Sequence, residues 1–211
     1  MKQWMRAVAT AVFILGMAWN AAWSATPAEP MAALKIPVDE VISLLKDPQW
    51  KEPGREVAQR EKIMTVVGTI FDFTEVSKRT LAQNWKRFNP QQRKEFTEVF
   101  GDFLGFTYYK KVRDSYQGET VVYLAQEMNG SDKAVVKTKI PRPAGDIPLD
   151  YRMLKRRENW RVYDVVIEGV SLVQNYRTQF KKILDKETPD QLIAKLKEKT
   201  AQQKNDSEKE P

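Results

Sequence analysis

The sequence predicts an α+β domain in which several helices wrap a twisted sheet of four antiparallel strands. Apolar residues recur every three or four positions over residues 37–117, which is the spacing of helices. They alternate with polar residues over 119–168, as in strands, and return to helical spacing from residue 170. Helices and strands that are grouped along the chain are typical of the α+β class. Helices over one face of a twisted sheet enclose a cone-like concavity, which side chains can fill or leave partly open.

Turn and capping residues divide these stretches into elements. Asn89 and Gln92 have the spacing of a capping box, and Pro90 suits the first turn of the helix that they begin. The short loops between the strands predict antiparallel pairing of neighbours. We expect helices over 37–47, 55–68, 74–87, 89–117, 170–184 and from residue 188 onward, and strands over 119–127, 133–140, 149–155 and 160–168.

The first 24 residues have the features of a cleaved secretory signal peptide. Lys2 and Arg6 precede an uncharged, mostly apolar run over residues 7–19, and small residues at 22 and 24 suit a signal peptidase. The run is about 13 residues long, shorter than the roughly 20 that a membrane span needs. An uncleaved anchor is the alternative. Removal of residues 1–24 would take away two of the 35 basic residues and none of the 28 acidic ones, so a net charge of +7 would fall to +5.

The remaining chain divides into three parts. Residues 25–36 are rich in proline and alanine and are expected to form an extended lead-in. Residues 37–200 hold the periodic segments and are expected to form one folded domain. Residues 201–211 have almost no apolar content, which predicts a disordered polar tail.

The composition excludes several kinds of chemistry. The chain has no cysteine and no histidine, so it offers no thiol nucleophile, no histidine base and hardly any ligand set for zinc or copper. We therefore predict no metal site. The positive charge suits an anionic lipid or an acidic partner surface, or serves solubility alone. Secretion makes nucleic acid an unsuitable partner.

Two carboxylates on the last predicted strand could have either a catalytic or a structural role. Asp164 and Glu168 are expected on the same face as Val162 and Val166. Such a pair could carry out acid–base catalysis. The reading that we favour is structural, in which each carboxylate pairs with an arginine such as Arg152 or Arg161.

Three features suggest an internal apolar pocket, and ordinary core packing is the alternative for each. The helix over 89–117 carries six aromatic residues between Phe96 and Tyr109, so it must contact apolar groups on two sides. Gly101 and Gly105 lie one turn apart, where they let another backbone approach or leave room for a ligand. The strands place mostly small and medium side chains toward the concavity.

One segment resembles the signature of the MlaC, or toluene-tolerance, family. It runs WRVYDVVIEGVSLV over 160–173 and continues through Asn175-Tyr176-Arg177 to Phe180. Upstream, Phe71-Asp72-Phe73, Leu81, Trp85, Pro90-Gln91-Gln92-Arg93 and Phe96, followed by Tyr108 and Lys110-Lys111, are similar to the first half of the family. The resemblance covers residues 37–197 in order.

The resemblance implies an NTF2-like cone with an apolar pocket and a periplasmic phospholipid carrier that maintains the lipid asymmetry of the outer membrane. Lipid tails would lie between sheet and helices, with the headgroup outside. The carrier would move phospholipid between an outer-membrane lipoprotein complex and an inner-membrane ABC transporter with an MCE-domain subunit. The implied protein is a monomer with no catalytic residues and no cofactor besides its phospholipid cargo. A cone-fold enzyme using the carboxylates and a fully packed periplasmic adaptor are the rival readings.

The candidate lipid-binding residues come from the apolar pattern of the predicted helices and strands. They are Phe71, Val76, Leu81, Trp85, Phe96, Phe100, Phe103, Leu104, Thr107, Val136, Thr138, Ile140, Val162, Val166, Val170 and Val173.

Overall fold

The computed structural model describes residues 29–52 and 54–209, so the predicted signal peptide over 1–24 lies outside the described residues. The helices are α1 (Pro30–Lys46), α2 (Glu56–Ile70), α3 (Phe73–Leu81), α4 (Pro90–Ser115), α5 (Leu172–Leu184) and α6 (Pro189–Lys209), with the 3-10 turns η1 (Pro48–Lys51) and η2 (Ala82–Arg87). The strands are β1 (Val122–Met128), β2 (Lys133–Ile140), β3 (Ile147–Arg156), β4 (Asn159–Ile167) and β5 (Val170–Ser171).

The sheet is antiparallel throughout, with its strands in chain order from β1 to β5. The predicted α+β class and the four antiparallel strands are confirmed. The fifth strand was not predicted, because β5 has only two residues, which pair with the end of β4. Its second residue, Ser171, also caps α5 by accepting a hydrogen bond from the backbone N–H of Gln174. The helix predicted from residue 170 therefore begins at Leu172.

A β-bulge at Tyr163 changes the inner face of β4. Arg152 pairs with Asp164, whereas the next residue, Met153, pairs with Val162, so Tyr163 is an extra residue without a partner across the ladder. The residues of β4 that pack on the inner side are Trp160, Val162, Val165 and Ile167.

The bulge overturns one prediction about this strand. Asp164 and Val166 lie on the outer face of the sheet, opposite Val162, because the extra residue shifts the alternation by one position. Glu168 lies beyond the end of β4, in the turn that leads to β5. The four residues therefore do not share a face.

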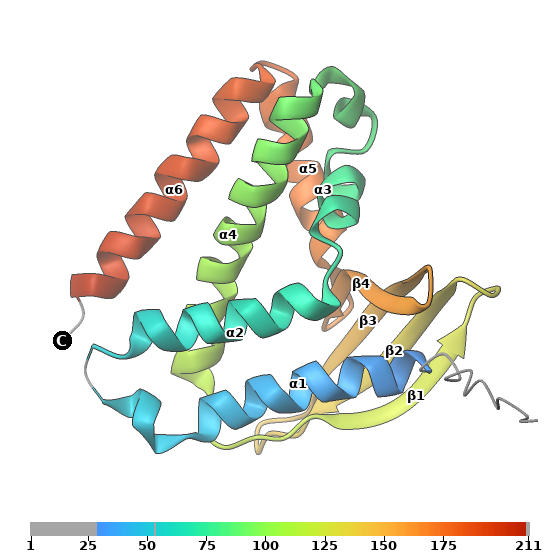
Figure 1. Ribbon diagram of the computed structural model, residues 1–211, viewed down its shortest axis with the longest axis vertical. Coiled ribbons are helices and arrows are strands. Elements are labelled where there is room, and N and C mark those ends of the chain that lie inside the picture. Colours follow the sequence, from blue (N-terminus) through green and yellow to red (C-terminus); the bar gives the residue numbers. More distant parts are fainter. Residues whose placement is uncertain (1–28, 53, 210–211) are drawn as a thin grey trace, which may run out of the picture.

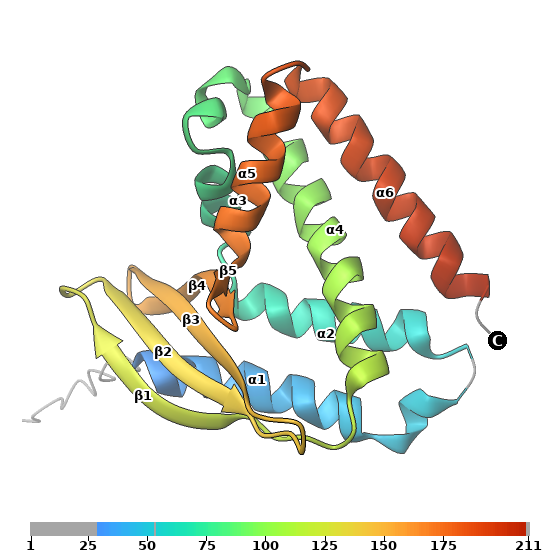
Figure 2. The same cartoon turned by 180° about the vertical axis from the view of Figure 1, so that it is seen from behind.

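Helices cover one face of the sheet and extend away from it (Figure 1). The blue helix α1 lies across the sheet and contacts β1, β2 and β4, and α2 runs beside α1. The long helix α4 crosses α2 and rises from this layer with α6 alongside, while α3 and α5 pack near β4. Figure 2 shows the outer face of β1, β2 and β3 in front of α1, with α5 starting beside β4 and β5.

The first helix corrects the predicted lead-in. Residues 30–36 belong to α1, so the extended segment expected over 25–36 is wrong for them, and 25–28 are not described. Leu34 is fully buried against the sheet, which favours helix across this stretch although Pro37 lies inside it. Proline removes one backbone hydrogen bond from a helix interior. The favourable burial of Leu34 and its neighbours outweighs that cost.

The last helix corrects the predicted tail. Helix α6 continues to Lys209, so the disorder expected over 201–211 is wrong for residues 201–209. Two contacts extend the helix beyond its last apolar residue, Leu196. Thr200 is buried, and the side-chain amide of Gln203 donates a 2.8 Å hydrogen bond to the hydroxyl of Thr107 on α4. Contacts with α4 therefore stabilise this end of the helix, although its sequence has no periodic apolar residues.

The interior is divided into two apolar clusters. The helical cluster is built by α3, α4, α5 and α6, and its buried residues are Val76, Leu81, Phe88, Phe96, Phe100, Phe103, Leu104, Val173, Tyr176, Phe180, Leu184, Leu192, Ile193 and Leu196. The sheet cluster lies between α1, the end of α2 and the sheet, and its buried residues are Leu34, Ile70, Ala134, Val136, Met153, Trp160, Val162 and Val165. Phe71 packs against both clusters.

Candidate functional site

The structure divides the candidate lipid-binding residues between the two clusters. Those in the helical cluster or packed on it are Phe71, Val76, Leu81, Trp85, Phe96, Phe100, Phe103, Leu104 and Val173. Val136 and Val162 belong to the sheet cluster, and Thr138 is buried beside them, with its hydroxyl donating to the carbonyl of Leu149. The candidates therefore belong to two packed clusters, which both contact Phe71.

The aromatic side chains of α4 pack on each other within the helical cluster. Phe96 and Phe100 are fully buried, with ring centroids 5.4 Å apart. Phe180 from α5 meets both rings edge-on at 5.8 and 5.2 Å. Tyr176 contacts Phe100 edge-on at 5.3 Å. This is the geometry of a closed aromatic core, in which edge-to-face pairs contribute about 0.5–1.5 kcal/mol each beyond their buried area.

Four candidates lie outside the closed packing. Val170 is 61% exposed in β5, so the prediction that it faces inward is wrong. Val166 is half-buried on the outer face because of the bulge. Ile140 is half-buried at the end of β2, and Thr107 is half-buried on α4.

A seam runs between the two clusters where α4 crosses α2. Along this seam the two glycines of α4 each receive a side chain. A Cβ on Gly105 would lie 2.7 Å from the sulfur and the terminal methyl carbon of Met64, and a Cβ on Gly101 would lie 3.5 Å from the ring of Phe73. The glycines thus admit side chains rather than another backbone, and Met64 and Phe73 fill the room that they leave.

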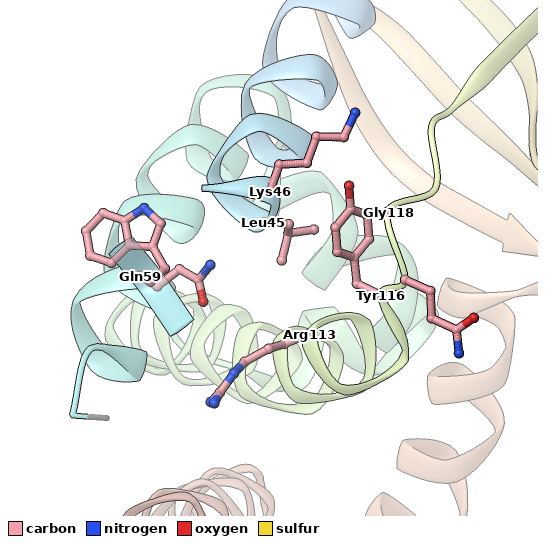
Figure 3. A pocket seen from close by; sticks show the side chains of 8 residues that line it. Leu45, Lys46, Gln59, Arg113, Tyr116 and Gly118 are labelled. Carbon is pink, nitrogen blue, oxygen red and sulfur yellow. The ribbon is translucent and has the colours of Figure 1, made fainter. Parts of the chain in front are cut away.

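A cavity of about 440 Å³ opens beside the seam, between the start of α2 and the end of α4 (Figure 3). The ends of α1 and η1 and the segment after α4 complete its wall. Its lining residues are Leu45, Lys46, Trp50, Gln59, Arg113, Tyr116, Gln117 and Gly118. Met64 and Gly105 lie further along the same two helices, beyond the hydrogen bond between Tyr109 and Gln59.

Hydrogen bonds organise one wall of this cavity. The hydroxyl of Tyr109 donates to the side-chain oxygen of Gln59 at 2.8 Å, and the amide nitrogen of Gln59 donates to the carbonyl of Leu44 at 2.9 Å. Arg113 forms an ion pair with Glu56 at 3.1 Å. Burial raises the pKa of the Tyr109 hydroxyl, so it stays a neutral donor at physiological pH.

Two buried donors of the cavity lining have no partner among the described residues. They are the indole nitrogen of Trp50 and the hydroxyl of Tyr116, whose pKa burial also raises. Buried donors are nearly always paired, so these two can donate to a ligand oxygen at little further cost. Apolar groups of Leu45 and Trp50 and the cationic side chains of Lys46 and Arg113 make the cavity amphipathic.

Sequence analysis missed the cavity. Trp50 lies in a 3-10 turn after Pro48, and that proline indicated only the end of a helix. Tyr116 follows the last residue of α4 and shares no periodic pattern with the other lining residues. Only the crossing of α2 and α4 brings these residues together, and no local pattern encodes that crossing.

The carboxylates of β4 do not form a catalytic pair. The Asp164 carboxylate accepts hydrogen bonds from Arg152 at 3.0 Å, from the Ser171 hydroxyl at 2.7 Å and from the backbone N–H of Val173 at 3.0 Å. The predicted ion pair is confirmed for Asp164. Glu168 is exposed and has no ion pair with any described residue, so its predicted pairing is wrong.

In residues 29–52 and 54–209, no group of three or more carboxylates is arranged to hold a metal ion. None of the helices in these ranges combines the length and the apolar content that a membrane crossing needs.

Comparisons with known proteins agree on one family. The family model described as MlaC protein matches residues 36–198. The intermembrane phospholipid transport system binding protein MlaC of Haemophilus influenzae is 23% identical over 128 residues, and the match spans 59% of this chain and 60% of that relative.

A solved structure shares the fold. A phospholipid-binding protein from Ralstonia solanacearum, determined in complex with a phospholipid, superposes with a TM-score of 0.71 and 25% identity, over 83% of this chain and 99% of that one. Together with the family match over most of the folded residues, this similarity leads to one conclusion: the chain belongs to the MlaC family.

Proposed function

We propose that this protein is a periplasmic carrier that binds phospholipid with its acyl chains in the seam between the helical cluster and the sheet cluster. The observation that carries the proposal is the division of the interior into two clusters that meet at Phe71, together with the contact of Met64 from α2 on Gly105 of α4. A ligand can enter such a boundary without dismantling either cluster. The phospholipid bound to the structural relative supports the choice of ligand.

The side chains that close the seam suit reversible opening. Met64 is unbranched and adaptable, and its end lies on Gly105, where no side chain competes for the space. Burial of each methylene group contributes about 0.8 kcal/mol, so two acyl chains with a total of about 30 carbons gain on the order of 24 kcal/mol on leaving water. This gain exceeds the cost of displacing a few apolar contacts between helices.

The amphipathic cavity is the proposed mouth. Its 440 Å³ lies toward the lower end of the range of about 300–1,000 Å³ for ligand pockets, so acyl chains would extend past it into the seam. Lys46 and Arg113 would face the phosphate, and the unpaired donors of Trp50 and Tyr116 would bind ester or phosphate oxygens. The headgroup would remain near solvent.

Transfer requires partners because a lipid with its chains in water is costly. We propose the partners that the family implies: an outer-membrane lipoprotein complex and the MCE-domain subunit of an inner-membrane ABC transporter. Direct docking would pass the lipid between apolar environments, and the positive charge of the carrier would steer the encounter. The complete hydrogen bonding of Asp164 disfavours the rival enzyme, so we propose a carrier without catalysis.

Mass spectrometry of lipid extracts tests the proposal. The mature protein, purified without detergent, should carry diacyl phospholipid in stoichiometric amounts. Gly105→Leu, which fills the position that Met64 occupies, should lose most of this lipid. Gly68→Leu is the matched control, because a Cβ at Gly68 meets nothing within 4 Å, and it should keep its lipid.

The opposite results have clear meanings. Wild-type protein that is free of lipid and takes none up from phospholipid vesicles would contradict the carrier and favour the packed adaptor. Equal lipid in the two folded leucine variants would place the acyl chains outside the seam. Circular dichroism melts confirm that each variant is folded before extraction.

A further inference from the structure

A second cavity of about 370 Å³ lies on the outer side of β4, between α3, β3 and the start of α5. Three arginines line it from three different elements: Arg79 from α3, Arg152 from β3 and Arg177 from α5. Asp164 is the one carboxylate in the lining. We call this cavity the arginine cleft. It lies across the sheet from the sheet cluster, and the proposed lipid path makes no use of it.

Contacts along their length hold two of these arginines in place. The Arg79 guanidinium lies over the ring of Tyr163, 4.0 Å from its centroid, and its Nε donates to Glu75 at 2.8 Å. The Nε of Arg177 donates to the backbone carbonyl of Arg79 at 2.9 Å. That carbonyl belongs to the last turn of α3, where no intrahelical donor remains for it.

These contacts leave donors unused. Among the described residues, neither terminal nitrogen of Arg79 makes a hydrogen bond, and the same is true of Nη2 of Arg177. The side chain of Arg152 is 44% exposed and uses only Nη1, toward Asp164. The Asp164 carboxylate is 3% exposed and already accepts three hydrogen bonds. The lining of the cleft therefore holds three cations and one satisfied anion, with Glu75 paired to the Nε of Arg79, and terminal N–H groups of the arginines remain free.

We propose that the arginine cleft binds a phosphate group, either as a free ion or as part of a lipid headgroup. Guanidinium groups donate paired N–H bonds that match the oxygens of phosphate, and arginines fixed in advance lose little side-chain entropy on binding. The fixed bonds to Glu75, Tyr163 and the end of α3 supply this preorganisation. The site goes beyond the proposed acyl-chain seam, and either can exist without the other.

NMR of the 15N-labelled mature protein tests the cleft directly. Inorganic phosphate is titrated at an ionic strength of about 0.15 M, which screens diffuse attraction to the positive surface. The arginine Nε–H signals of Arg79 and Arg177 should shift together with one saturable affinity. Arg177→Lys keeps the positive charge but loses the paired N–H groups of the guanidinium. It should weaken binding at least about tenfold, a difference of roughly 1.4 kcal/mol. Lys182→Gln, on the exposed side of the same helix, should leave it unchanged.

The wild-type shift map does not depend on the folding of any variant. Shifts that do not saturate, or that spread over surface lysines without the two arginines, would overturn the proposal. Equal affinity of wild type and Arg177→Lys would also overturn it. This readout is independent of lipid extraction, so failure of the carrier proposal would be seen separately.

A second titration identifies the source of the phosphate. Glycerophosphoglycerol, the headgroup of phosphatidylglycerol without acyl chains, has the phosphodiester of a lipid but cannot enter the seam. Tighter binding of this probe than of inorganic phosphate would support a headgroup at the cleft. Binding of inorganic phosphate alone would support a free ion. Binding of neither would refute the site.

Discussion

The helical cluster and the sheet cluster bury similar kinds of residues but achieve different packing. In the helical cluster, the rings of Phe96 and Phe100 stack on each other, and Phe180 meets both of them edge to face, so each ring fixes its neighbours. In the sheet cluster, Leu34 from α1 and Val136 from β2 bring aliphatic side chains together, without such ring pairs. The rings of the helical cluster interlock, whereas the sheet cluster presents mainly aliphatic side chains. A boundary between two such units can open while each unit stays intact.

The largest effect is expected in the helical cluster. Phe100→Ala removes a fully buried ring that contacts three other aromatic rings, and should lower the free energy of unfolding by about 3–5 kcal/mol. Urea denaturation of lipid-free protein measures the loss. Native-state hydrogen exchange sharpens the comparison, because amides of α4 and α5 should exchange faster while those of β2 and β3 change less. Equal acceleration in both regions would show that the clusters form one cooperative unit.

A smaller effect is expected where β4 meets α5. Asp164→Asn removes the charge that binds Arg152, Ser171 and the backbone N–H of Val173, and should cost about 2 kcal/mol. Arg152→Gln is the control, because its side chain is 44% exposed and surface ion pairs contribute at most about 1 kcal/mol. Denaturant midpoints compare the two variants. A larger loss for Arg152→Gln would mean that the ion pair, and not the cap of α5, joins these elements.

A still smaller effect is expected at the start of α4. Asn89→Ala removes the side chain that accepts from the backbone N–H of Gln92, at a cost of about 1 kcal/mol. Asn89→Ser keeps an acceptor and should retain most of the stability. Thermal melts of the two variants would contradict the capping role if they coincided.

The effect that is smallest at neutral pH is a pH dependence of the sheet side. Burial raises the pKa of the Tyr151 hydroxyl to about 12, from an ordinary value of 10.0. The folded state therefore favours the neutral hydroxyl, and the stability that this contributes is present below pH 10 and is lost as the pH rises toward 12. Tyr151→Phe should flatten the decline in unfolding free energy over that range. An unchanged alkaline profile would mean that Tyr151 is not buried as described.

The features that follow from local rules could be predicted from sequence. The capping box at Asn89, the break at Pro48 and the alternation of β2 each depend on a few neighbouring residues, and the structure confirms them. The β-bulge at Tyr163 could not be predicted, because strand alternation looks the same until one extra residue shifts it. The division of the aromatic candidates from the strand candidates also required the tertiary fold.

The corrected ends of the domain have a common reason. Residues 30–36 and 201–209 lack strong helical patterns, yet both are helical. Leu34 is buried on the sheet and Gln203 bonds to Thr107 on α4, so contacts far away in the sequence override weak local propensity. For the same reason the seam and its cavity could not be predicted from the sequence, since Met64 and Gly105 meet only when α2 crosses α4.

A reversible disulfide across the seam would show whether α2 and α4 must separate to admit lipid. The chain has no cysteine, so a pair at Met64→Cys and Gly105→Cys would be the only thiols. The Cγ of Met64 lies 3.4 Å from the Cβ position at Gly105, which brings the two sulfurs within reach of a disulfide. Uptake of phospholipid from vesicles is measured on the oxidised and reduced forms of this one protein. The oxidised form should take up little lipid, and reduction of the disulfide should restore uptake. Equal uptake by both forms would contradict a seam that opens between α2 and α4.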